Sequence, residues 1–298
     1  MSAVPHPPPS RLGDPRYYQI AVLTGLLTYG TWALEFDIKP WQIPLTLAVA
    51  LVTQWACTKI WQLPAFDPRS ALISALSLCL LLRVDTLWVA LAAAIAAVAS
   101  KFIVQVNRKH IFNPTNGAIV LMMLATPAAW LSPGQWGSVA FFAFLMACLG
   151  GLVAYRALRS DVALAFIVVY AGLMFGRSYY LGEPMAIPMR RLESGGLLLF
   201  TFFMISDPRT TPDHPIARVL YGALVACVAW YIQFRLFRTN GVIWSLALCS
   251  PLVPVLDRVL PGRRFSWTDA AVLPLVPILG RLRRTPSPAV ALERIHVS

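Results

Sequence analysis

Two polar sequences interrupt the apolar stretches of this chain and contain its best candidates for chemistry. The segment "ISDPRTTPDHP" (205–215) places carboxylates, an arginine and three prolines between two apolar runs, and a second "DPR" occurs at 67–69. Asp is a favoured N-cap residue, and Pro is favoured at the first helical position. Asp67-Pro68 and Asp207-Pro208 therefore both predict helix starts, and Asn113-Pro114 predicts a third.

A helix start within the membrane would point unpaired N–H groups and a positive dipole end at whatever lies before it. One interpretation is a cavity lined by ligand-binding groups, because broken backbone at membrane depth is tolerated only around protein or a cavity. The other is plain helix capping at the membrane surface, with each Arg facing lipid phosphates. The candidate cofactor-binding residues are Asp67, Arg69, Ser70, Asn113, Thr115, Asn116, Asp207, Arg209, Thr210, Thr211 and Asn240.

The composition indicates the solvent in which these helices must fold. The 298 residues are 58% hydrophobic and 13% charged, whereas a soluble domain carries about a quarter charged residues. The expected fold class is therefore an all-α polytopic membrane protein, and its surroundings are the lipid bilayer. The net charge of +12 is spread over short loops and a basic tail, which suits membrane orientation and argues against a nucleic-acid partner. The five Cys form no CxxC, and no metal-binding spacing occurs, so no metal site is expected.

About ten apolar segments can be marked, and a full crossing needs about 20 residues. Three segments are short and could be tilted, re-entrant or half-length: 70–84, 161–175 and 195–206. With the N-terminus in the cytoplasm, ten crossings place most Lys and Arg, including Lys101 and the tail, on the cytoplasmic side, so both termini are expected there. The segments are 17–35, 41–59, 70–84, 86–104, 116–131, 135–154, 161–175, 195–206, 216–237 and 241–259.

An internal repeat is suggested by two pairs of short words. "DPRS" (67–70) matches "DPRT" (207–210), and "TNGAI" (115–119) matches "TNGVI" (239–243), in the same order. The pattern predicts a five-plus-five inverted repeat with interrupted helices, which commonly holds its site near the midplane. We expect an N-terminal tail (1–16), a transmembrane domain (17–260; repeats about 17–131 and 135–259) and a cytoplasmic, partly disordered basic tail (261–298). Counting crossings puts the two TNG words on opposite faces of the membrane, as an inverted repeat requires. The two DPR words fall on opposite faces only if 70–84 is re-entrant or 195–206 is half-length.

Three longer segments resemble the family of the membrane subunits NqrB and RnfD, from sodium-pumping NADH:quinone reductase and the Rnf electron-transport complex. They are "FDPRSALISALSLCLLL" (66–82), "KHIFNPTNGAIVLMMLATPAAWLSPGQWGS" (109–138) and "GGLLLFTFFMISDPRTTPDHPIARVLYGAL" (195–224). The resemblance implies ten helices in two inverted repeats of five, a flavin-bearing electron carrier, and a multi-pass protein of the bacterial plasma membrane. The word "FFMISDPRTTP" is also similar to a shortened UnbU-like subgroup that is associated with enediyne biosynthesis clusters.

The sequence departs from that family's pattern at the motif that holds the flavin. The family attaches covalent FMN to the threonine of an "SGAT" motif, and the corresponding stretch here contains only "LESGGLL" (192–198). Covalent FMN is therefore not expected. A non-covalent flavin (FMN or riboflavin) or a quinone is expected instead, because Asn amides suit heterocycle edges. Arg190 and Arg191 could bind an FMN phosphate or simply meet lipid head groups.

Three functions stay open. The first is an electron-transport subunit served by redox partner proteins, so that any catalysis belongs to a complex. The second is a transporter or channel that has lost the flavin. The third is a membrane scaffold for a biosynthetic enzyme. His110 and His214 could pass protons to a quinone, although a histidine in a surface loop is the commoner case.

Overall fold

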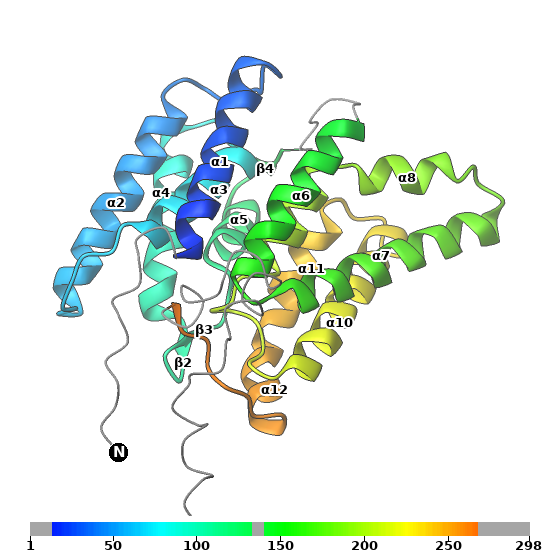
Figure 1. The fold of residues 1–298 in the computed structure, drawn as a ribbon. Coiled ribbons are helices and arrows are strands. Elements are labelled where there is room, and N and C mark those ends of the chain that lie inside the picture. The colour runs from blue at the N-terminus through cyan, green and yellow to red at the C-terminus, as the bar shows by residue number, and fades with distance from the viewer. Residues whose placement is uncertain (1–13, 133–139, 268–298) are drawn as a thin grey trace, which may run out of the picture.

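The computed structural model describes residues 14–132 and 140–267, which form two helical halves side by side (Figure 1). The first half contains α1 (Pro15–Trp32), α2 (Gln42–Ile60), α3 (Arg69–Leu81), α4 (Leu87–Ile103) and α5 (Pro114–Ala125). The second contains α6 (Ala140–Arg156), α7 (Ser160–Leu181), α8 (Ala186–Leu192), α9 (Gly195–Leu199), the π-helix η2 (Phe200–Met204), α10 (Pro215–Phe234), α11 (Gly241–Cys249), the 3-10 helix η3 (Ser250–Leu252) and α12 (Val253–Val259).

Four helical stretches in the described residues are long and apolar enough to cross a membrane: α2, α7, α10 and the continuous run Gly241–Val259. The chain is therefore a multi-pass membrane protein. Several other apolar helices are shorter. At ~1.5 Å of rise per residue, the 13 residues of α3 span ~20 Å, less than the ~30 Å of a hydrocarbon core.

Helix lengths correct two of the predicted segments. The segment 161–175 was expected to be short, but α7 has 22 residues because its helix continues through a polar and aromatic end to Gly182, which caps it with φ 66°. The segment 116–131 was expected to cross, but α5 ends after 12 residues and the strand β4 (Ala129–Leu131) follows. The total of ten crossings and the inverted repeat stay predictions.

Two small antiparallel pairings fix the ends of the short helices. β1 (Leu82–Val84) follows α3 and pairs with β4, with Arg83 opposite Trp130, so the far ends of α3 and α5 are tied together. β2 (Gln105–Val106) and β3 (Lys109–His110) form a hairpin at the opposite end of α4. Its two turn residues, Asn107 and Arg108, both have positive φ, as a type I′ turn requires.

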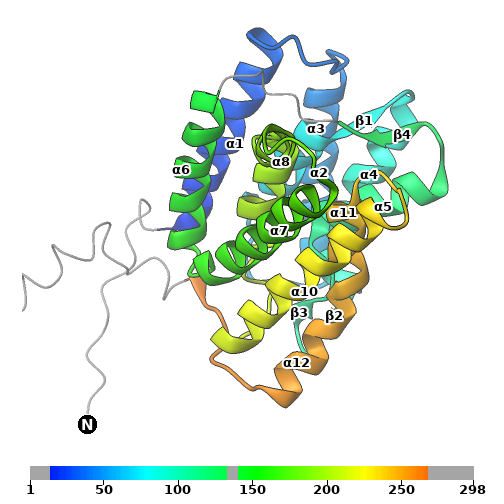
Figure 2. The ribbon, with the colours of Figure 1, turned by 90° about the vertical axis from the view of Figure 1, so that its right-hand side faces the viewer.

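The helices of the second half pack closely at two glycines. A Cβ on Gly222 of α10 would lie 2.7 Å from the carbonyl oxygen of Val162 in α7. A Cβ on Gly241, at the start of α11, would lie 2.6 Å from the carbonyl oxygen of Ala229 in α10. Any larger residue at either position would therefore force the two backbones apart. Figure 2 shows α7 and α10 side by side.

The three predicted helix starts have different outcomes. Asn113 caps α5 as predicted, accepting a hydrogen bond from the N–H of Asn116 at 3.1 Å. α3 begins at Arg69, whose N–H donates to the Asp67 carboxylate at 3.2 Å. The prediction at Asp207-Pro208 is wrong, because only a turn follows and α10 begins at Pro215. Pro212 explains the difference, since a proline disfavours helical geometry in the residue before it and supplies no N–H.

Several charges expected in loops are buried instead. Lys101 lies in the last turn of α4 and is 4% exposed, and Arg83 is 5% exposed. Arg83 donates to the carbonyl oxygen of Cys79 at 2.9 Å, and Arg159 donates to the hydroxyl of Thr211 at 2.8 Å. Charge counting along the sequence could not detect this, because a cation at a helix end looks the same whether it faces water or the interior.

Candidate functional site

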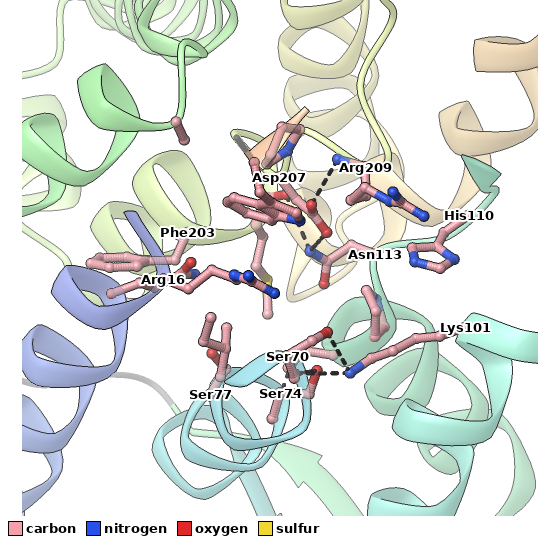
Figure 3. Close-up of a pocket in the computed structure, with 18 of the residues that line it drawn as sticks. Arg16, Ser70, Ser74, Ser77, Lys101, His110, Asn113, Phe203, Asp207 and Arg209 are labelled. Atoms are coloured by element: carbon pink, nitrogen blue, oxygen red, sulfur yellow. Dashed lines mark hydrogen bonds between the residues drawn. The ribbon is translucent and has the colours of Figure 1, made fainter. Parts of the chain in front are cut away.

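A cavity of about 790 Å³ with both polar and apolar walls lies where the two halves meet, and the N-terminal ends of α1, α3 and α5 open onto it. Its volume falls within the roughly 300–1,000 Å³ usual for cofactor and ligand sites. The π-helix η2 and the turn after it form the facing wall, and Figure 3 shows the polar side chains converging there. Single π-helical turns inside helices often occur at functional sites.

Four alternating charges link α1 to α3 at one edge of the cavity. Arg16 contacts Asp14 and Asp67 at 2.7 Å each, and Arg69 contacts the same two carboxylates at 2.6 and 2.7 Å. Burial raises the pKa of both carboxyl groups, but the hydrogen bonds and positive charges of the two arginines outweigh it, so both pKa values lie below the usual value. The two arginines are thereby held in fixed positions by ionised partners.

Lys101 supplies a cation to the opposite wall. Its ammonium donates to the carbonyl oxygen of Ser70 at 2.8 Å and to the Ser70 hydroxyl at 3.0 Å (Figure 3). Neither partner carries a formal charge, so no bonded carboxylate neutralises Lys101 where it lines the cavity.

The third wall joins α5 to the turn after η2. The Asn113 amide donates to the Asp207 carboxylate at 3.2 Å and to the carbonyl oxygen of Met204 at 3.3 Å. The N–H of Arg209 donates to the other Asp207 oxygen at 2.9 Å. Burial raises the pKa of Asp207, although this N–H and the charges of Arg209 and Lys101 oppose the shift. Asp207 is thus a carboxyl group whose negative charge is only partly compensated.

Two of the residues that line the cavity carry a buried acceptor atom with no hydrogen-bond partner among the residues that the structure describes: Gln54 Oε1 and His110 Nδ1. Burial, followed by the charges of Arg209 and Lys101, lowers the pKa of His110 to about 4, so the ring is neutral near pH 7. Buried polar atoms are normally satisfied. A small turn of either side chain would let its acceptor atom meet a donor in the cavity.

The electrostatics of the cavity favour an anionic, partly aromatic ligand. Four cations but only two carboxylates belong to the lining, and three helix N-termini add partial positive charge. The same lining includes the aromatic side chains of Trp61, Phe102, Phe202, Phe203 and Trp267. Cations for a phosphate, aromatic faces for a ring system and free acceptors for ring N–H groups are the set that a flavin nucleotide requires, so the residues fit that cofactor.

Six of the predicted site residues line this cavity: Asp67, Ser70, Asn113, Thr115, Asp207 and Arg209. The other five do not line it. Arg69 supports the edge through its ion pairs, and Asn116 is fully buried and donates to the carbonyl oxygen of Ile243 in α11 at 3.0 Å. Thr210 and Thr211 are buried within the turn after Asp207, and Asn240 lines a separate hollow beside Trp130. Arg190 and Arg191 lie in α8 and do not contribute to the cavity either.

Sequence reasoning missed Arg16 and Lys101 as cavity residues, and it treated His110 as a loop residue. The sequence does hold one usable signal, since "GDPRYY" at 13–18 repeats the DPR word a third time. Asp14-Pro15 caps α1 in the structure, with Asp14 accepting from the N–H of Arg16 at 3.0 Å. No comparable signal marks Lys101, which sits within an apolar run.

Comparisons with known proteins match one family over part of the chain. The pattern of the NQR2, RnfD, RnfE family matches residues 129–266. The chain is 28% identical over 129 residues to the D component of the ion-translocating oxidoreductase complex of Escherichia coli (strain K12), covering 43% of this chain and 32% of that protein. The corresponding proteins of Citrobacter koseri and Yersinia pseudotuberculosis are 28% and 26% identical over 125 residues, 41% of this chain and 34% of each relative. The aligned part thus spans about a third of the length of these curated relatives.

Proposed function

We propose that this chain is a membrane subunit of an electron-transfer complex, related to RnfD and NqrB, and that its cavity binds a flavin non-covalently. The observation that carries the proposal is the cavity itself, which combines four cations, three helix N-termini and aromatic walls within an apolar helical protein. The family match over residues 129–266 and the relatives named as parts of an ion-translocating oxidoreductase complex support the same function.

Each wall has a role in this proposal. Lys101 and Arg209 bind the phosphate, because both are basic residues that line the cavity and neither forms an ion pair with a carboxylate among the described residues. Gln54 and His110 accept hydrogen bonds from ring N–H groups, since both have free buried acceptor atoms. Bound flavin would supply one- and two-electron chemistry that side chains lack. Asp207, whose pKa is raised, can hold a proton beside the ligand.

The wider setting is proposed as well. Ten crossings in two inverted repeats of five, with both termini in the cytoplasm of a bacterial plasma membrane, would place redox partners or a quinone at the cavity. Short helices in both halves, α3 and the run Gly195–Met204, support the interrupted helices of such a repeat. If the chain belongs to the UnbU-like subgroup, the electrons that it transfers would be used by enzymes of a biosynthetic cluster.

The test is the absorption spectrum of the detergent-purified protein before and after acid precipitation. Bands near about 370 and 450 nm that pass into the supernatant support a non-covalent flavin. Colour kept in the pellet overturns the non-covalent mode, and a protein that stays colourless after FMN and riboflavin are added overturns flavin binding. Lys101→Gln should weaken FMN more than riboflavin, which lacks the phosphate, whereas the exposed Lys59→Gln is the matched control and should change neither.

One observation favours a second function, passage of a small polar solute. Ser70, Ser74 and Ser77 all line the cavity from α3, at helical spacings that place them on one face. Such a polar stripe would suit a channel or transporter that has lost its flavin. Solute flux into proteoliposomes that is abolished by Ser74→Leu, from a colourless protein, would support this function over the first.

A further inference from the structure

Residues 260–267, which follow α12, run back toward the cavity. From Leu260 to Trp267 the chain runs from the lower end of α12 toward the base of α1, as the orange segment in Figures 1 and 2 shows. Trp267 ends this path and is one of the residues that line the cavity. Trp267 therefore covers part of the cavity beside the N-terminal end of α1, where Arg16 lies.

Two aromatic rings dock this segment onto fixed cations. The Arg16 guanidinium lies 4.7 Å from the centre of a Trp267 ring, and the Arg159 guanidinium lies 5.2 Å from the centre of the Phe265 ring. The two aromatic rings also pack edge to face, with centroids 4.8 Å apart. Other contacts fix each arginine in place: two carboxylates bind Arg16, and the Thr211 hydroxyl accepts a hydrogen bond from Arg159. The two rings therefore pack against groups that are held in position.

Gly262 fixes the start of the path. A Cβ at this position would lie 2.5 Å from the carbonyl carbon of Asp213 and 2.5 Å from the backbone nitrogen of His214. Asp213 is itself anchored, because its carboxylate contacts Lys109 at 3.0 Å and its N–H donates to Asp257 at 2.8 Å. Only glycine allows the segment to lie this close, and any side chain here must lift it.

We propose that residues 260–267 are a strap that closes the cavity, and that the Trp267 ring is the wall against which the planar ring of the ligand stacks. The identity of the ligand as a flavin rests on the proposed function, whereas closure by the strap does not. Cation–π and ring contacts join the strap to the cavity edge. Residues 261–266 belong to no helix, so the strap can lift without unfolding α1 to α12, and the ligand enters and leaves when it does.

Closure is tested without any ligand by thiol chemistry inside the cavity. Ser77 is buried and lines the cavity, so Ser77→Cys places a thiol behind the strap. Its modification by the anionic reagent sulfonatoethyl methanethiosulfonate is measured against the parent protein, which corrects for the five native cysteines. Adding Gly262→Ala should speed the reaction about tenfold, equivalent to about 1.4 kcal/mol of lost closure. Gly176→Ala is the matched control, because no atom lies within 4 Å of its Cβ position.

Ligand stacking is tested separately by flavin titration. Trp267→Ala should raise the Kd for FMN about tenfold and speed thiol modification, whereas Trp267→Phe should keep both values near those of the parent. The strap would be overturned if the Ser77→Cys thiol reacted at the same rate with and without Gly262→Ala or Trp267→Ala. This holds whatever the flavin titration shows. An unchanged FMN affinity in Trp267→Ala would overturn the stacking wall. A parent protein that binds no flavin would overturn the proposed function and the stacking wall together, while the thiol rates would still decide the strap.

Discussion

Asp14→Asn should destabilise the protein, because Asp14 is the least exposed carboxylate of the four-charge cluster at the cavity edge. Its carboxylate accepts hydrogen bonds from the Arg16 side chain at 2.7 Å and the Arg69 side chain at 2.6 Å, with the Asp14 side chain 11% exposed. Asparagine is also a good N-cap, so the substitution keeps the start of α1 and removes the charge.

The expected loss can be estimated from the burial of the partners. Breaking a buried ion pair costs roughly 3–5 kcal/mol when the remaining charge is uncompensated. Asp67 still neutralises Arg16 in the variant, so we expect the lower end, about 3 kcal/mol. At roughly 2–4 °C per kcal/mol for a protein of this size, Tm falls by roughly 6–12 °C. Intrinsic tryptophan fluorescence during heating in detergent measures it, with the exposed Asp85→Asn as control.

The pH dependence gives a second, independent check of the same reasoning. The pKa values of Asp14 and Asp67 are lowered in the folded protein, so their stabilisation is present above the ordinary value of 3.8 and is lost as pH falls through the folded-state values. The Tm difference between wild type and Asp14→Asn should therefore be full at pH 6–7 and shrink below about pH 4. A difference under about 2 °C at pH 7, or one equally large at pH 2.5, would refute the argument.

Three further predictions follow from single contacts. Gly241→Ala should cost about 1–3 kcal/mol by pushing α11 away from the Ala229 carbonyl, measured as a lower Tm, whereas Gly176→Ala should leave Tm unchanged. His110→Asn should remove a rise in stability between about pH 4 and 6.5, because a depressed histidine pKa costs stability as pH falls through that window; an identical pH profile in the variant would contradict this. Lys101→Met should slow the reaction of a Ser77→Cys thiol with the anionic reagent while speeding that with the cationic trimethylammonium analogue, and equal changes for both reagents would argue against an anion-attracting cavity.

Local signals on the chain were sufficient for the short-range features. Asn113-Pro114 predicted the start of α5, because a side-chain acceptor and a missing N–H act within one turn. The same rule failed at Asp207-Pro208, where Pro212 stops the helix. α10 starts instead at His214-Pro215, where the His214 ring accepts from the N–H of Ile216 at 3.2 Å although His is not a favoured N-cap residue. A capping rule thus identifies candidate starts, and the following prolines decide between them.

The assembly of the cavity could not be predicted in the same way, because its walls come from segments far apart in the chain. Lys101 reaches Ser70 across 31 residues, and Asn113 reaches Asp207 across 94. The sequence shows that Lys101 is charged, but it does not show where the side chain points. That direction depends on how α4 packs against the short α3. Half-length helices leave room at their ends for polar side chains, and that room exists only after packing.

The repeated DPR words show why a shared motif does not imply a shared role. Asp67 precedes a helix and is held ionised by Arg16 and Arg69, so it is an electrostatic support. Asp207 follows a π-helix, is bound by neutral donors, and has a raised pKa, so it is the carboxyl group better suited to exchanging a proton with a ligand. The difference arises because helix α3 brings Asp67 against the arginines of α1 and of its own first turn, whereas α5 brings only an amide to Asp207. If electron transfer in this cavity is coupled to proton uptake, Asp207→Asn should remove that coupling, and Asp67→Asn should lower stability instead.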